Sequence, residues 1–150
     1  MKKNVTSFAI ALVLISSVAT LAQKKSDGID KIVFGSYKVG QIDLKEYAIS
    51  KSGEILYTAR MDKNYAHIGH LGKTEMKELF AYCDSKQWTD YIKFNPGKDY
   101  KYIRLYTGKE YTEMMWAENG ADAQMHEAFT KLSKLVEGYT LPDPVMAAQH

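Results

Sequence analysis

Two runs of strand-favouring residues meet at Gly108 and Lys109 and predict a β-hairpin. The runs, 100–107 and 110–117, are rich in aromatic and β-favouring side chains. A two-residue loop with glycine first suits a type II′ turn, whose twist matches that of paired strands. This loop sets a register in which Arg104 faces Glu113, a favourable cross-strand pair.

The hairpin register divides the side chains between two faces, because successive strand residues alternate. One face is apolar and carries Ile103, Leu105, Met114 and Trp116. The other face is aromatic and charged and carries Tyr100, Tyr102, Arg104, Tyr106, Tyr111 and Glu113.

Upstream of the hairpin, residues 31–39, 41–50 and 54–60 read as strands separated by Gly40 and by a turn at 51–53. Residues 65–71 form a further short extended piece. The apolar residues of 41–50 would point to opposite faces of a regular strand, with Ile42 and Leu44 on one face and Tyr47 and Ile49 on the other. If only one face of this strand is buried, an extra residue is needed to bring all four apolar side chains onto that face. We therefore expect a bulge near Lys45-Glu46.

Two segments have helical periodicity. In the first, Thr74 is the expected N-cap, Gln87-Trp88 closes the helix, and the apolar stripe contains Met76, Leu79, Phe80 and Cys83. In the second, Asn119 is the expected cap, Gly138 the stop, and the stripe contains Met125, Ala128, Phe129, Leu132, Leu135 and Val136.

This order of elements predicts one α+β domain over residues 31–139, followed by an extended tail at 140–150. We expect an antiparallel sheet of about five to six strands, with both amphipathic helices on one face. The helices should cover the side of Ile103 and Leu105. The side of Tyr102 and Arg104 should then be at least partly open to water.

The first residues have the three-part pattern of a secretory signal peptide. A basic start is followed by an apolar run at 8–18, and Thr20 and Ala22 supply small residues before a cut at Gln23. The run is short for a bilayer, which takes about 20 residues. We therefore expect a signal peptide over 1–22, a mobile lead-in over 23–30, a periplasmic or extracellular location, and no stable membrane insertion after cleavage.

Charge and cysteine usage narrow the classes of partner. The formal net charge is +2, and the excess is Lys2 and Lys3 of the signal segment. The remaining chain is near neutral, which argues against nucleic acid as a partner. Cys83 is the only cysteine. It does not follow the predicted cleavage site, so it is no lipid anchor, and we expect a buried, unpaired thiol.

The motifs for cofactors, metals and catalysis are incomplete. Gly72-Lys73-Thr74 resembles the end of a phosphate-binding loop, but His67 stands where that loop needs glycine. His67 and His70 point to opposite faces of a strand, which defeats chelation. No nucleophile and base form a recognisable pair. We expect no cofactor, no metal and no enzymatic activity, an enzyme being the least supported class.

The tyrosines are the remaining signal, since the chain holds 11 of them. Tyrosine and arginine are enriched at binding hot spots, although tyrosine is also simply a good residue for a half-exposed strand. We therefore expect a binding domain for an unknown envelope protein or polymer, using the aromatic and charged hairpin face. The alternative is an inhibitor of an envelope enzyme that acts through the loop at 95–98.

The layout resembles small, uncharacterised exported domains of Gram-negative bacteria, in which a β-meander precedes a helix, a tyrosine-rich hairpin and a last helix. The stretches that carry the resemblance are ISKSGEILYTAR, LGKTEMKELF and FNPGKDYKYIRLYTGKEYTEMMWAEN. The resemblance implies the α+β fold and brings no assigned activity. Many members of that family begin with a lipid-modified cysteine, and this chain does not.

Overall fold

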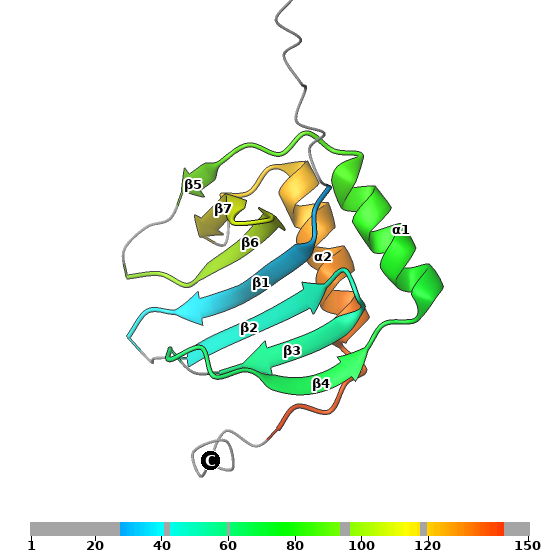
Figure 1. The fold of residues 1–150 in the computed structure, drawn as a ribbon. Helices are drawn as coiled ribbons and strands as arrows, with labels where there is room; N and C mark the ends of the chain where they lie inside the picture. The colour runs from blue at the N-terminus through cyan, green and yellow to red at the C-terminus, as the bar shows by residue number, and fades with distance from the viewer. Residues whose placement is uncertain (1–27, 41–42, 60, 94–96, 118–119, 143–150) are drawn as a thin grey trace, which may run out of the picture.

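A computed structural model of the chain describes residues 28–40, 43–59, 61–93, 97–117 and 120–142. In these residues, one seven-stranded sheet has the strand order β4-β3-β2-β1-β6-β7-β5 (Figure 1). The strands are β1 Lys31–Lys38, β2 Asp43–Ser50, β3 Glu54–Thr58, β4 Ala66–His70, β5 Tyr91–Lys93, β6 Tyr100–Thr107 and β7 Glu110–Ala117. The helices are α1 Lys73–Asp84 and α2 Ala123–Val136.

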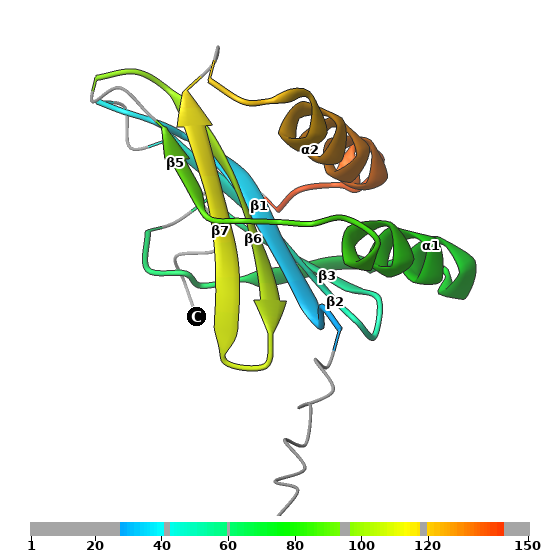
Figure 2. The ribbon, with the colours of Figure 1, turned by 90° about the horizontal axis from the view of Figure 1, so that it is seen from above.

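Both helices lie on the same side of the sheet, which confirms the predicted α+β architecture (Figure 2). All neighbouring strands are antiparallel except β5, which runs parallel to β7. The sequence pattern did not predict β5. It has only three residues, too few for a periodicity, and it forms because the chain leaving α1 passes along β7.

The hairpin of β6 and β7 has the predicted register. Arg104 pairs with Glu113, and Tyr102 pairs with Met115. Gly108 has a φ of 63°, the left-handed value that a type II′ turn requires at its first position. The predicted division of side chains between the two faces follows from this register.

The main core lies between the sheet and the helices, on the side predicted for Ile103 and Leu105. The sheet contributes Ile32, Phe34, Ile49, Ile55, Ile103, Leu105, Met114 and Trp116. The helices contribute Leu79, Phe80, Cys83, Met125, Ala128, Leu132 and Val136. Cys83 is free and buried, as predicted, and burial raises the pKa of its thiol to about 12.

The helix ends differ from the predictions. The N-cap of α1 is Gly72, not Thr74, and its backbone N–H donates to Glu75 Oε2 at 3.0 Å. The helix ends at Asp84 rather than at Gln87-Trp88. The N-cap of α2 is Asp122, whose carboxylate accepts from the backbone N–H of Met125. The predicted cap Asn119 lies outside the described residues.

The predicted bulge at Lys45-Glu46 was wrong. The pairing of β1 with β2 runs without interruption from Lys31–Ser50 to Lys38–Asp43. The irregularity in this part of the sheet lies instead between Ile55 and Leu56, where β3 pairs with β4. The bulge is unnecessary because both faces of β2 are buried, so its apolar residues can point to opposite sides.

The packed domain extends upstream of the boundary expected at Lys31. Ile29 belongs to the main core, and its backbone N–H donates to Asp84 Oδ1 at 2.9 Å. Asp30 Oδ2 accepts from the backbone N–H of Gly108 at 2.8 Å. Residues 28–30 are therefore part of the fold, in contrast to the mobile lead-in predicted over 23–30.

The predicted signal peptide and its cleavage site lie outside the described residues. Among the residues that are described, no helix combines the length and apolar character needed to cross a bilayer.

Candidate binding face

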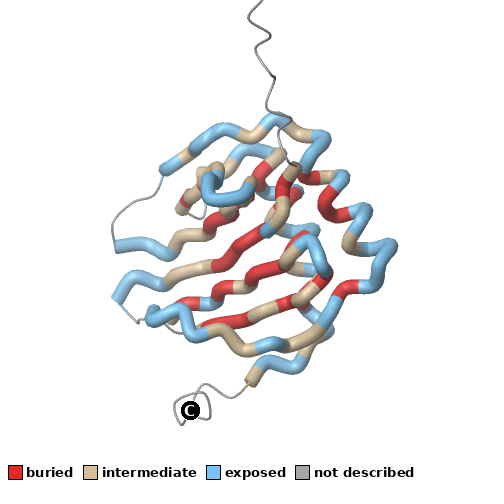
Figure 3. Tube along the Cα trace, viewed as in Figure 1, coloured by how far each residue is buried: buried red, intermediate tan, exposed pale blue. Residues whose placement is uncertain are grey.

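The sheet face opposite the helices contains a second, smaller buried cluster. Its members are Val33, Leu44, Ala48 and Tyr102, flanked by partly buried Tyr37, Leu56, Tyr65, Tyr100, Tyr106 and Met115. Buried positions lie mainly in the middle of the strands, and exposed positions lie mainly in the segments that connect them (Figure 3). This face is therefore a mixed surface with a covered centre and a half-exposed margin.

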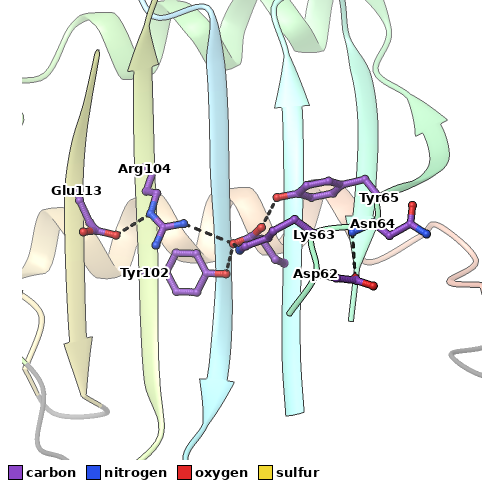
Figure 4. Close-up of polar contacts among 8 residues, drawn as sticks. Asp62, Lys63, Asn64, Tyr65, Tyr102, Arg104 and Glu113 are labelled. Carbon is purple, nitrogen blue, oxygen red and sulfur yellow. Dashed lines mark hydrogen bonds and ion pairs between the residues drawn. The ribbon is translucent and has the colours of Figure 1, made fainter. Parts of the chain in front are cut away.

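Glu46 lies at the centre of this face, and its side chain is 0% exposed. The hydroxyls of Tyr65 and Tyr102 donate to its two carboxylate oxygens. Lys63 Nζ lies 2.5 Å from Glu46 Oε2, and Arg104 Nη1 lies 3.6 Å from the same atom. The four side chains converge on the carboxylate (Figure 4). We call Glu46 with these four partners the Glu46 anchor.

A glycine in the intervening strand makes room for this contact. Gly35 pairs with Glu46 on one side and with Tyr102 on the other, so the three residues form one row across β2, β1 and β6. Because Gly35 has no side chain, the Tyr102 hydroxyl can reach the carboxylate across β1. The strands also approach closely there, since a Cβ at Gly35 would lie 2.1 Å from the backbone oxygen of Lys45.

The connection between β3 and β4 delivers the other two donors. Lys63 has a φ of 58°, a left-handed conformation that is unfavourable for a residue with a Cβ. Asn64 N–H donates to Asp62 Oδ1 at 3.2 Å and tightens the same turn. This turn directs the side chains of Lys63 and Tyr65 toward Glu46 (Figure 4).

The Glu46 carboxylate is held in its charged form. Burial alone would raise its pKa, but hydrogen bonds from Lys63, Tyr102 and Tyr65 outweigh burial and lower the pKa below the ordinary value of 4.5. Burial and the same hydrogen bonds raise the pKa of both tyrosine hydroxyls, which therefore stay protonated as donors. A carboxylate has about four acceptor positions, and here four donors surround it. This arrangement suits an anchor better than a general base.

Arg104 connects the anchor to the outer strand of the hairpin. Its Nε lies 2.6 Å from Glu113 Oε1, and the guanidinium carbon lies 4.9 Å from the centroid of the Tyr102 ring. The side chains of Arg104 and Glu113 are 24% and 18% exposed. Burial would lower the pKa of Arg104, but the contact with Glu113 raises it.

The predicted site residues divide into two groups. Tyr102 was expected on an open face, and this was wrong, since it is 3% exposed and belongs to the buried cluster against which Tyr65 packs. Tyr100, Arg104, Tyr106 and Glu113 are partly exposed, and Tyr111 is 50% exposed. The structure thus brings all six together on one face, but only five of them reach solvent.

The exposed margin has two tyrosine pairs. The rings of Tyr106 and Tyr111 lie 5.0 Å apart, and Lys31 Nζ lies 4.0 Å from the Tyr106 ring centroid. At the opposite ends of these strands, the rings of Tyr37 and Tyr100 lie 5.3 Å apart. We call Lys31, Arg104, Tyr106, Tyr111 and Glu113 the tyrosine rim.

Sequence reasoning missed Glu46, Lys63, Tyr65 and Gly35 as parts of this face. The sequence does indicate a special role for Glu46, because it lies between Leu44 and Ala48 on the same face of a strand. A charge flanked in this way needs a partner if the face is buried. The predicted bulge removed that signal by placing the residue outside the regular alternation.

Comparison with known proteins gives no relative from which a function can be transferred. No protein-family model matches the chain, and no curated protein matches it. Among the residues that the structure describes, no three His, Cys, Asp or Glu side chains gather in a way that could hold a metal ion.

Proposed function

We propose that this chain is a small exported binding domain that recognises an envelope protein through the tyrosine rim. The observation that carries the proposal is the half-exposed Tyr111, whose ring lies 5.0 Å from that of Tyr106, beside the charged side chains of Lys31 and Arg104. Tyrosine and arginine provide contact area and a polar group together, which is why they dominate protein hot spots.

The Glu46 anchor supports this proposal by making the rim rigid. Arg104 is held by Glu113, by the Tyr102 ring and by the Glu46 carboxylate, so its position is fixed before a partner arrives. A side chain that is already ordered loses less conformational entropy on binding. The rim also offers both signs of charge, which favours a protein partner over a uniformly charged polymer.

The alternative functions have less support. The inhibitor hypothesis relies on the loop at 95–98, of which residues 95 and 96 lie outside the described residues. The enzyme hypothesis would need a titratable group with a free acceptor, whereas the Glu46 carboxylate already contacts four donors.

The test is affinity capture from an envelope extract, followed by titration of the purified captured protein. We expect Tyr111→Ala combined with Tyr106→Ala to weaken the measured affinity at least about tenfold, as loss of hot-spot side chains does. Lys77→Ala, an exposed change on α1 behind the sheet, is the matched control and should leave affinity unchanged.

Equal affinity of the rim variant and the wild type, with the fold intact, would contradict the proposal. Retention of the wild type by purified cell-wall polymer instead of by any protein would also contradict it.

A further inference from the structure

A groove on the helix side of the sheet lies apart from the tyrosine rim. It has a volume of about 500 Å³ and lies where α2 passes over β1, β2 and β6. Its sheet side is one row across three strands, because Ser36 pairs with Lys45 on one side and with Lys101 on the other. This row is polar, whereas the next row inward, with Phe34 and Ile103, belongs to the main core.

The walls of the groove are positively charged. Lys45 and Lys101 line it from the sheet and Lys134 from α2, and one acid, Glu137, is among the lining residues. Within the described part of the chain, none of the three lysines forms an ion pair. Lys101 Nζ instead lies 5.3 Å from the centroid of the Phe129 ring. Three unpaired cations in one groove contrast with the near-neutral charge of the domain.

The floor of the groove is aromatic. Phe34 and Tyr47 stack at 5.3 Å, and Phe129 meets Phe34 edge-on at 6.0 Å. The lining residues also include three with hydroxyl groups, Ser36, Thr130 and Ser133. An apolar floor with a few convergent polar groups is the usual composition of small-molecule sites, which measure about 300–1,000 Å³.

We propose that this groove binds a small amphiphilic anion, in which a carboxylate or phosphate group is attached to an apolar body. The apolar body contacts Phe129 and Tyr47, and the anionic group lies between Lys45 and Lys101. Both halves are needed: the lysines alone would attract any anion, and the aromatic floor alone would attract any apolar molecule. The proposal does not depend on the tyrosine rim, because the two sites lie on opposite faces of the sheet.

The test is calorimetric titration of the purified protein with decanoate and with decyl phosphate, both below their micellar concentrations. We expect saturable binding of at least one of them, weaker binding at higher ionic strength, and negligible binding of decanol. Inorganic phosphate alone should not compete, since it lacks the apolar body. In NMR spectra, the backbone amide resonances of Ser36 and Phe129 should shift as the probe that binds is added.

The variant for this test is Lys45→Gln combined with Lys101→Gln, with Lys77→Gln on α1 as the matched control. Two lost attractions should weaken binding about tenfold, while the control should bind like the wild type. Equal binding of the anionic probe by the double variant would overturn the proposal. It would be overturned as well by decanol binding as tightly as decanoate, by effective competition from inorganic phosphate, or by no saturable binding of either anion.

Discussion

Each face of the hairpin contains buried side chains, but the two faces bury them by different interactions. On the helix side, Ile103 and Trp116 pack among apolar neighbours of the main core. On the other side, Tyr102 is also buried, but its hydroxyl must find a partner, and that partner is the Glu46 carboxylate. Apolar burial is roughly proportional to area and has no required direction, whereas a buried carboxylate needs its donors in place.

This difference means that the two faces should respond differently to substitution. The helix face has many interchangeable contacts, so a change of similar volume should be tolerated. The opposite face depends on one group that joins β2, β6 and the β3–β4 connection, so loss of that group should affect all of them together.

Glu46→Ala should destabilise the fold by about 2–5 kcal/mol, since each buried donor left without a partner costs about 1–3 kcal/mol. The change leaves the Tyr65 and Tyr102 hydroxyls without their acceptor. Urea unfolding at neutral pH measures the effect. Glu78→Ala, an exposed change on α1, is the control and should alter stability by less than about 0.5 kcal/mol. If Glu46→Ala also changed the free energy of unfolding by less than about 0.5 kcal/mol, the Glu46 carboxylate would not stabilise this face of the sheet.

Ile103→Ala should cost about 2–4 kcal/mol through lost burial and the cavity left behind. Ile103→Val should cost less than about 1.5 kcal/mol, because most of the side chain remains. The same unfolding experiment measures both. If the two variants were equally unstable, the helix face would not have the tolerance described above.

Gly35→Ala should cost about 1–3 kcal/mol, as overpacking does. The new Cβ would lie 2.1 Å from a backbone oxygen, so β1 and β2 must shift. Gly138→Ala is the matched control, since a Cβ there meets nothing within 4 Å. Thermal unfolding of the two variants should separate them clearly; indistinguishable melting temperatures would argue against the close approach at Gly35.

Arg104→Ala should cost about 1–2 kcal/mol, because its charged hydrogen bond to Glu113 is lost. This exceeds the value below about 1 kcal/mol that an exposed ion pair would give, since both partners are partly buried. A double-mutant cycle with Glu113→Ala isolates the pair. A coupling near zero would show that the pair contributes nothing to the rim.

Local patterns predicted much of the fold. The hairpin register follows from one two-residue loop, and the helices follow from apolar spacing over several turns, so neighbouring residues contain the information. The strand β5 could not be predicted in this way, because three residues carry no period and its pairing with β7 depends on the path of the whole chain.

The candidate site was predicted in part. Alternation placed Tyr106, Arg104 and Glu113 on one face. It could not show that Tyr102 is buried, because its neighbours Glu46 and Tyr65 come from other parts of the chain. The Glu46 anchor combines residues from β2, β6 and that turn, and Gly35 matters only once the strand order is known.

The most direct measurement of the role of Glu46 is the free energy of unfolding of the wild type and of Glu46→Gln across pH. The pKa of Glu46 is lowered in the folded protein, so its charged form adds stability above the unfolded value near 4.5, and this contribution is lost as pH falls below that value. We therefore predict that the wild type exceeds the variant by a constant amount near neutral pH and that this advantage shrinks below about pH 4.5. An advantage that stays constant or grows on acidification would contradict the Glu46 anchor.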